Sequence, residues 1–175
     1  MFSITTERLR LLPLPLAHLE LLQKGRSELE EALNLVQSNM QTDKSMLGAL
    51  DKTIEFWLRK VKEDPINYPW HTSWEIIHEK ENRIIGMIGL SGVPNENGET
   101  VIGYSIDIRY HNRGFMTEAL AGLIDWVATN PRLKRIIAET HEENYPSHSV
   151  LIKNGFEEID IDLGEQTILF GKRFY

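Results

Sequence analysis

A short stretch between residues 109 and 118 combines basic side chains, a glycine and the start of a helical pattern. Five consecutive positions contain three basic or potentially basic side chains, Arg109, His111 and Arg113, although the chain as a whole is acidic. Gly114 follows them and lets the backbone turn and approach a ligand closely. The N–H groups in the first turn of a helix lack internal partners and lie at the positive end of the helix dipole. The stretch therefore has the chemistry of an anion site, and a pyrophosphate suits it.

A strand that ends at Ile108 and a helix that begins near Phe115 are expected to flank this loop. The apolar residues after the loop recur at offsets of three, four, seven, eight and eleven, which describes one helix face. They are Met116, Ala119, Leu120, Leu123, Ile124 and Val127. An ordinary strand-to-helix turn, with glycine for geometry and arginines for solubility, explains the same residues about equally well. Neither the P-loop pattern nor the Gly-x-Gly-x-x-Gly dinucleotide pattern occurs, so phosphate recognition here needs a different loop.

A second group of polar residues lies about thirty residues further along the chain. Asn144 and Ser147 flank Pro146, a residue at home in the first turn of a helix. Taken separately, each of the two is better explained as a helix cap. A short helix is predicted over 146–154, and Asn154 with the following glycine suits a left-handed C-cap.

The segments that must position these residues divide into an early helical part and a later sheet. Helices are predicted over 16–37, where Gly25 breaks the run into two, and over 47–62. Helix and strand alternate after a three-stranded antiparallel meander. Strands are predicted over 4–14, 74–78, 83–90, 100–108, 135–140, 156–161 and 166–173. The sequence contains no internal repeat and no interdomain linker, so a single domain is expected over 1–175.

Composition restricts the kinds of partner. The chain of 175 residues has a formal net charge of −7, which argues against a nucleic-acid partner and is compatible with a cationic amine. It has no cysteine, which excludes a disulfide framework and a cysteine nucleophile. No apolar run approaches the roughly 20 residues of a membrane span, and the N-terminus lacks the layout of a signal peptide. We expect a cytoplasmic protein with no membrane partner and, from the spacing of its histidines, no metal site.

Two segments in the middle of the chain carry a family resemblance. Ile102–Asp107, followed by Asn112–Leu120, resembles the acyl-CoA-binding motif of the GNAT N-acetyltransferase superfamily. That motif is commonly written Gln/Arg-x-x-Gly-x-Gly/Ala, and its frame here is His111–Met116. The central glycine is present, whereas histidine and methionine stand at the two outer positions. The Thr-Glu-Ala-Leu continuation is similar to the branch that contains ribosomal-protein alanine N-acetyltransferases.

The resemblance extends over nearly the full chain. Glu139–Phe156 is similar to the other characteristic GNAT stretch, in which Asn-x-x-Ser precedes a helix ending in Gly-Phe. Thr6–Leu11 resembles the first strand of the same branch. The fold that this resemblance implies is α/β, with a mixed sheet of about seven strands, a splayed central pair and helices on both faces.

Acetyl-CoA is the co-substrate that the resemblance implies. Backbone N–H groups from about Arg113 to Thr117 would hold its pyrophosphate, and Asn144 would bond its pantetheine or a backbone amide. A backbone N–H between Ile106 and Ile108, where the sheet splays, would stabilise the oxyanion. The expected co-substrate-binding residues are thus Ile106, Ile108, Arg113, Gly114, Phe115, Met116, Thr117 and Asn144.

The resemblance also implies a general base for the attacking amine. Some family members place a glutamate five residues before the asparagine of the second motif, and here that residue is Glu139. A carboxylate beside the amine could accept its proton directly or through water. A solvent-facing strand glutamate is the competing interpretation. Glu142 and Glu143 lie nearby and are better explained as loop charges.

Ser147 is the residue expected to assist the leaving thiolate, directly or by ordering water. A tyrosine later in this helix does so in a related branch, but the matching position here is Leu151. Tyr145 is an alternative on the same helix. Asp107 either orients the substrate or caps the turn that follows the strand.

The expected reaction is transfer of an acetyl group to a primary amine by direct attack in a ternary complex. A protein N-terminus is the first acceptor class, and a small molecule such as a polyamine or an aminoglycoside is the alternative. A catalytically silent CoA-binding module is the rival outside the enzymes. The helices between residues 16 and 62 should wall the acceptor site. A homodimer is a further possibility that the sequence leaves open.

Overall fold

The structure is a computed structural model that describes residues 2–41 and 44–175, and for residues 44–51 it describes the backbone alone. The described chain contains one mixed sheet of eight strands in the order β1-β2-β3-β4-β5-β6-β8-β7. Their bounds are β1 Ile4–Thr5, β2 Leu9–Pro13, β3 Ser73–His78, β4 Arg83–Leu90, β5 Glu99–Ile106, β6 Arg135–His141, β7 Glu157–Asp162 and β8 Thr167–Arg173.

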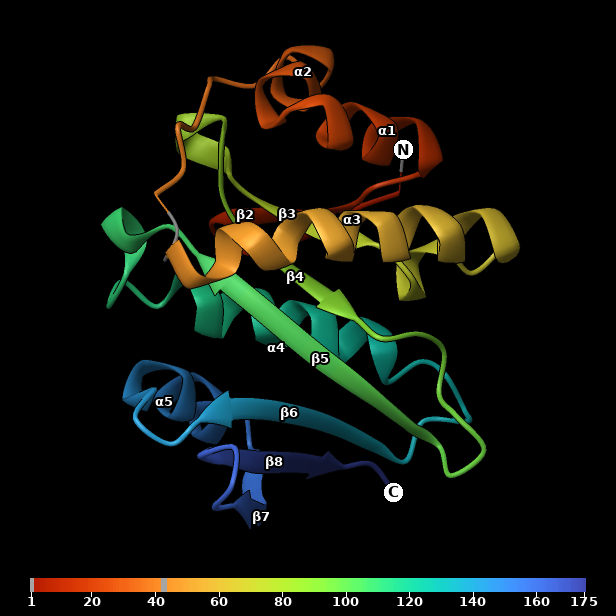
Figure 1. Cartoon of the computed structure of the whole chain (residues 1–175), viewed down its shortest axis with the longest axis vertical. Helices are drawn as coiled ribbons and strands as arrows, with labels where there is room; N and C mark the ends of the chain where they lie inside the picture. Colours follow the sequence, from red (N-terminus) through yellow and green to blue (C-terminus); the bar gives the residue numbers. More distant parts are fainter. Residues whose placement is uncertain (1, 42–43) are drawn as a thin grey trace.

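Five α-helices cover the two faces of this sheet (Figure 1). They are α1 Leu16–Lys24, α2 Arg26–Ala32, α3 Lys44–Glu63, α4 Phe115–Val127 and α5 Tyr145–Lys153. Short 3-10 helices lie at η1 Tyr68–Trp70, η2 Glu79–Glu81 and η3 Ile108–Tyr110. No helix within the described residues is long and apolar enough to cross a bilayer.

Two separate apolar cores hold the helices to the sheet. The helices α1, α2 and α3 pack on one face, where their buried residues meet Leu12, Ile77 and Ile84 of the strands. The helices α4 and α5 pack on the opposite face against residues such as Ile102 and Ile136. Adjacent strand residues point to opposite faces, so neighbouring positions on one strand serve different layers.

The predicted splay of the central strands is confirmed. β2 to β5 form the antiparallel meander, whereas β5 and β6 run parallel. The pairing of β5 with β6 begins at Glu99↔Arg135 and ends at Ile102↔Ala138. The last four residues of β5 and the last three of β6 therefore diverge, and they leave a wedge between the strands.

Two predicted boundaries near the start of the chain were wrong, each because of a tertiary contact. The strand over 4–14 is interrupted at residues 6–8, where Thr6 turns back onto the carbonyl of Leu9 and the carboxylate of Glu118 accepts bonds from Thr6 and Arg8. The second early helix ends at Ala32 rather than near residue 37, because the chain straightens to pair Val36 with β4. With β1 counted separately the sheet has eight strands, close to the predicted number of about seven.

The strand predicted over 100–108 ends at Ile106. The carboxylate of Asp107 accepts a hydrogen bond from the N–H of Arg109 at 2.9 Å, which starts the 3-10 turn η3. Gly25 divides the first two helices as predicted. Gly155, with φ of 76°, ends α5 in the left-handed conformation expected of the Asn-Gly pair.

Candidate active site

The wedge between β5 and β6 presents different side chains to the two faces of the sheet. Ile136 and Ala138 of β6 are buried against α4 and α5, so Glu139 points to the other face, where α2 and α3 lie. On β5, Ile102 and Tyr104 share the α5 face. The predicted base and the side chain of Tyr104 thus flank the same wedge from opposite sides.

Tyr104 contacts the predicted Ser147 directly. The phenol oxygen lies 2.8 Å from Oγ of Ser147, and either atom can donate. Burial raises the pKa of Tyr104 to about 12, and the bond with Ser147 offsets this only in part. The phenol is therefore protonated across the pH range of ordinary assays. Sequence reasoning assigned Tyr104 no role, although the residue lies inside the Ile-Gly-Tyr-Ser-Ile-Asp segment that carries the family resemblance.

Asn144 caps the helix that carries Ser147. Its Oδ1 accepts the backbone N–H of Ser147 at 3.2 Å, and Pro146 stands in the first turn of α5 as predicted. Of the two alternatives expected for Asn144, the structure contains the bond to a backbone amide. This bond fixes the start of α5 and thereby the place of Ser147 at the wedge.

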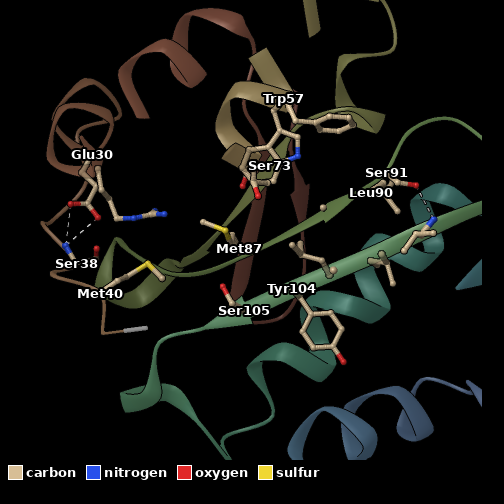
Figure 2. Close-up of a pocket in the computed structure, with 18 of the residues that line it drawn as sticks. Glu30, Ser38, Met40, Trp57, Ser73, Met87, Leu90, Ser91, Tyr104 and Ser105 are labelled. Atoms are coloured by element: carbon tan, nitrogen blue, oxygen red, sulfur yellow. Dashed lines mark hydrogen bonds between the residues drawn. The ribbon is translucent and has the colours of Figure 1, made fainter. Parts of the chain in front are cut away.

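Glu139 lines a cavity of about 790 Å³ between the sheet and the early helices. The side chain of Glu139 is exposed to solvent in this cavity. One end of the cavity holds the buried Glu30 and Ser38, and Met40, Trp57 and Met87 line its walls (Figure 2). The helices α2 and α3 therefore wall a pocket beside Glu139, whereas α1 supplies none of its described lining residues.

The predicted anion loop has the backbone geometry that such a site needs. Gly114 is the N-cap of α4, and its φ of 78° lies in the left-handed region that favours glycine. The N–H groups of Phe115, Met116 and Thr117 meet no acceptor among the described residues. The side chains of Phe115 and Met116 are buried in the core, so that neither crowds the free N–H groups.

The basic residues of the loop divide between two tasks. Arg113 is exposed beside the loop, with its guanidinium 5.0 Å from the ring centre of Phe115 and 5.3 Å from that of Tyr110. Arg109 instead turns away from the loop to the segment 38–41, so the expectation that it serves the anion site was wrong. Arg113 therefore supplies positive charge at the start of α4.

An ion pair between the buried Asp107 and the exposed Arg109 fastens this segment of the pocket wall. The carboxylate of Asp107, which is fully buried, accepts the N–H of Gln41 at 3.2 Å. Nη2 of Arg109 donates to the carbonyl of Ser38 at 2.7 Å. Of the two roles expected for Asp107, the structure supports the turn cap.

The two predicted oxyanion donors differ in availability. The N–H of Ile108 donates to the carbonyl of Gln41 at 3.2 Å, which contradicts its expected role as a free donor. The N–H of Asp107 points to β4, 2.8 Å from the carbonyl of Ile85. Because successive N–H groups of a strand alternate in direction, the N–H of Ile106 points into the wedge. The N–H of Ile106 therefore remains a candidate oxyanion donor, whereas the N–H of Ile108 does not.

The residues at the wedge and at the start of α4 fit an extended ligand that ends in a pyrophosphate. The pairing of β5 with β6 stops at Ile102 and Ala138, so the strands leave the wedge between them beyond this point. Free backbone N–H groups and the positive charge of Arg113 lie at the start of α4. Within the described chain, no group of three histidine, aspartate or glutamate residues is placed to hold a metal ion.

The Acetyltransferase (GNAT) domain family matches this chain over residues 8–157. The chain belongs to the GNAT acetyltransferase family. The GNAT family match spans the wedge, the α4 loop and the Asn144–Ser147 cap in one continuous segment, so the two motifs seen in the sequence belong to one domain pattern.

Relatives with curated descriptions match over part of the chain. An uncharacterized N-acetyltransferase, YjdG of Bacillus subtilis, is 33% identical over 84 residues, which are 48% of this chain and 50% of the relative. The ribosomal-protein-serine acetyltransferase of Escherichia coli is 31% identical over 77 residues, 44% of this chain and 43% of the relative. The chain thus spans about half the length of the curated relatives it matches.

The fold matches a solved GNAT structure over its whole length. RimL, a ribosomal L7/L12 alpha-N-protein acetyltransferase in complex with coenzyme A, superposes with a TM-score of 0.70 and 15% identity, covering 98% of each chain. At this level of identity the likeness establishes the fold. The mixed sheet with its splayed pair is therefore the GNAT fold predicted from the sequence.

Proposed function

We propose that the protein transfers an acetyl group from acetyl-CoA to a primary amine. The observation that carries this proposal is the placement of Glu139 and the Tyr104–Ser147 pair on opposite faces of one wedge. Acyl transfer to an amine needs a proton acceptor on the side of the amine and a proton donor on the side of the leaving group. The face with Glu139 provides the proton acceptor, and the face with Tyr104 and Ser147 provides the proton donor.

Glu139 is the proposed general base. It lies on the α2–α3 face, where the cavity can admit an amine, and its carboxylate is free to accept a proton directly or through water. Within the described chain no hydrogen bond or ion pair engages this carboxylate, so the side chain is available for that task.

Ser147 and Tyr104 are the proposed proton donors on the opposite face. Oγ of Ser147 can deliver a proton into the wedge and recover one from the phenol of Tyr104, 2.8 Å away. Tyr104 therefore shares the role that the sequence analysis gave to Ser147, with Tyr145 as the alternative. The N–H of Ile106 faces the wedge between the two sides and is the proposed oxyanion donor.

The co-substrate would be held by backbone groups. The free N–H groups from Phe115 to Thr117, with Gly114 before them and the charge of Arg113 beside them, suit a pyrophosphate. Acetyl-CoA supplies the acetyl group as a thioester. The wedge beyond Ile102, where β5 and β6 no longer pair, suits its extended arm.

The acceptor that we propose is the N-terminal amine of a protein. This choice is supported by the names of the Escherichia coli relative and of RimL, which both describe acetylation of ribosomal proteins. A small-molecule amine is the alternative acceptor. The buried polar end of the cavity suits a small molecule as well, so the experiment compares both classes of acceptor.

A thiol-release assay tests the proposed function. The purified chain is incubated with acetyl-CoA and, in separate reactions, with short peptides that have free N-termini, with polyamines and with aminoglycosides. We expect amine-dependent release of CoA thiol that falls at least tenfold in Glu139→Gln. Tight binding of acetyl-CoA by calorimetry without thiol release from any amine would instead identify a silent CoA-binding module.

A further inference from the structure

Glu30 is a buried carboxylate with few partners. It lies on α2 at 2% exposure, and both of its oxygens are 3.2 Å from the same donor, the N–H of Ser38. A carboxylate has about four acceptor sites, and one shared N–H satisfies few of them. No lysine, arginine or histidine of the described chain forms an ion pair with Glu30.

Ser38, the donor to Glu30, has an unsatisfied group of its own. The residue is 1% exposed, and its Oγ has no hydrogen-bond partner among the described residues. Glu30 and Ser38 both line the cavity that Glu139 lines, and Figure 2 shows them together at one end of it. Buried polar groups are usually paired, so two under-satisfied groups side by side indicate a place for a ligand atom.

The charges around the cavity favour a cation at that place. Arg26 is the cation among the described residues that line the cavity, and its Nη1 is 2.7 Å from the fully buried carboxylate of Glu75. Among the described residues, none supplies a compensating charge to Glu30 or Glu139. Since an isolated buried carboxylate is costly, a positively charged ligand group beside Glu30 is favoured over a neutral or an anionic one.

The walls of the cavity suit an aliphatic linker between two charged groups. Met40, Phe56, Trp57 and Met87 line it with apolar surface, and aromatic faces tolerate a passing cation. A ligand with one amine at Glu139, a hydrocarbon spacer and a second cation at Glu30 matches both ends and the walls of the cavity.

We propose that Glu30 and Ser38 bind a second, positively charged group of the acceptor whose other amine is acetylated beside Glu139. This inference rests on the proposed function and names the acceptor class as a dicationic amine. The second charge can come from the far end of a linear diamine or from a basic side chain that follows the N-terminal residue of a peptide. Both sources share the chemistry that the Glu30 end of the cavity recognises.

Matched pairs of acceptors test this proposal. The thiol-release assay compares linear diamines of three to six carbons with monoamines of the same length, and tetrapeptides beginning Ser-Lys with tetrapeptides beginning Ser-norleucine. We expect kcat/KM of the wild type to be on the order of tenfold higher for the dicationic member of at least one pair. The pair that shows the preference identifies the source of the second charge.

Glu30→Gln is the decisive variant. Its side-chain oxygen can still accept the N–H of Ser38, so the cavity wall keeps its anchor while the charge is removed. The preference for the dicationic acceptor should fall to within about twofold of unity. Ser38→Ala should reduce the preference partially, and Glu31→Gln, an exposed neighbour on the same helix, should leave it intact.

Two results would overturn the proposal. One is a wild type that treats both members of every pair alike, and the other is a Glu30→Gln variant that retains the preference. Calorimetry with 1,5-diaminopentane and with the Ser-Lys tetrapeptide separates this failure from a failure of the proposed function. Binding that depends on Glu30 without thiol release supports the binding site and refutes the transferase, whereas release without preference does the reverse.

Discussion

The phenol of Tyr104 and the hydroxyl of Ser147, 43 residues apart in the chain, lie 2.8 Å from each other at the splayed end of the central strands. β5 supplies the first and α5 the second. Their contact exists because the pairing of β5 with β6 stops at Ile102, which opens the wedge that α5 closes on one face.

Removal of the phenol oxygen in Tyr104→Phe should lower kcat about tenfold while leaving KM for acetyl-CoA nearly unchanged, because proton transfer is impaired and binding is not. Ser147→Ala should lower kcat further, and the double variant should be no slower than Ser147→Ala if the two act in series. Steady-state kinetics of the three variants measures this. Additive losses would show that Tyr104 and Ser147 act independently.

Glu139→Gln should reduce kcat on the order of a hundredfold at neutral pH with little change in CoA affinity, since the amide cannot accept the amine proton. Raising the pH should partly restore the rate, because more of the acceptor is then already neutral. Glu142→Gln serves as the matched control on the adjoining loop. Equal losses in the two variants would remove the special role of Glu139.

Gly114 is held at a φ of 78°, which proline cannot adopt. Gly114→Pro should therefore weaken CoA binding at least tenfold by distorting the start of α4, whereas Gly114→Ala should cost about 1 kcal/mol of stability and less affinity. Calorimetric titration with CoA and circular dichroism measure the two effects. Unchanged affinity in the folded proline variant would exclude this loop as the phosphate site.

The Asp107–Arg109 pair ties residues 38–41 of the proposed acceptor cavity to the end of β5. Arg109→Gln should release that wall, so that the amides of Ser38 and Gln41 exchange hydrogen faster and KM for the acceptor rises. The dissociation constant of CoA should change less than about twofold. Hydrogen-exchange mass spectrometry and kinetics test this, and slow exchange in the variant would contradict it.

Glu118 should make stability depend on acid pH. Burial by itself would raise the pKa of this carboxyl, but donors from Thr6 and Arg8 outweigh burial and lower it below its ordinary 4.5. The stabilisation is then complete above about pH 4.5 and is lost as the pH falls through the lowered value. Urea midpoints between pH 3 and 7 should show Glu118→Gln less stable by roughly 2 kcal/mol at pH 7, with the difference shrinking towards pH 3.

The sequence by itself determined those features that depend on local chemistry and on spacing. Apolar periodicity placed α4, Gly114 marked the turn before it, and the Asn144–Ser147 spacing marked the cap of α5. These patterns involve residues only a few positions apart. The same helix, turn or cap therefore forms wherever the segment lies in the fold. Together with the GNAT resemblance, they were sufficient to predict the mixed sheet and its splay.

Only the tertiary structure decided how residues far apart in the chain meet. In the folded chain Arg109 donates to the carbonyl of Ser38 and does not face the expected anion loop. The N–H of Ile108 donates to the carbonyl of Gln41. The phenol of Tyr104 is hydrogen-bonded to Ser147. Glu30 is also buried, at one end of the cavity that Glu139 lines. The physical reason is that a polar side chain finds its partner by packing between elements, and the spacing of residues along the chain carries no record of which elements pack together.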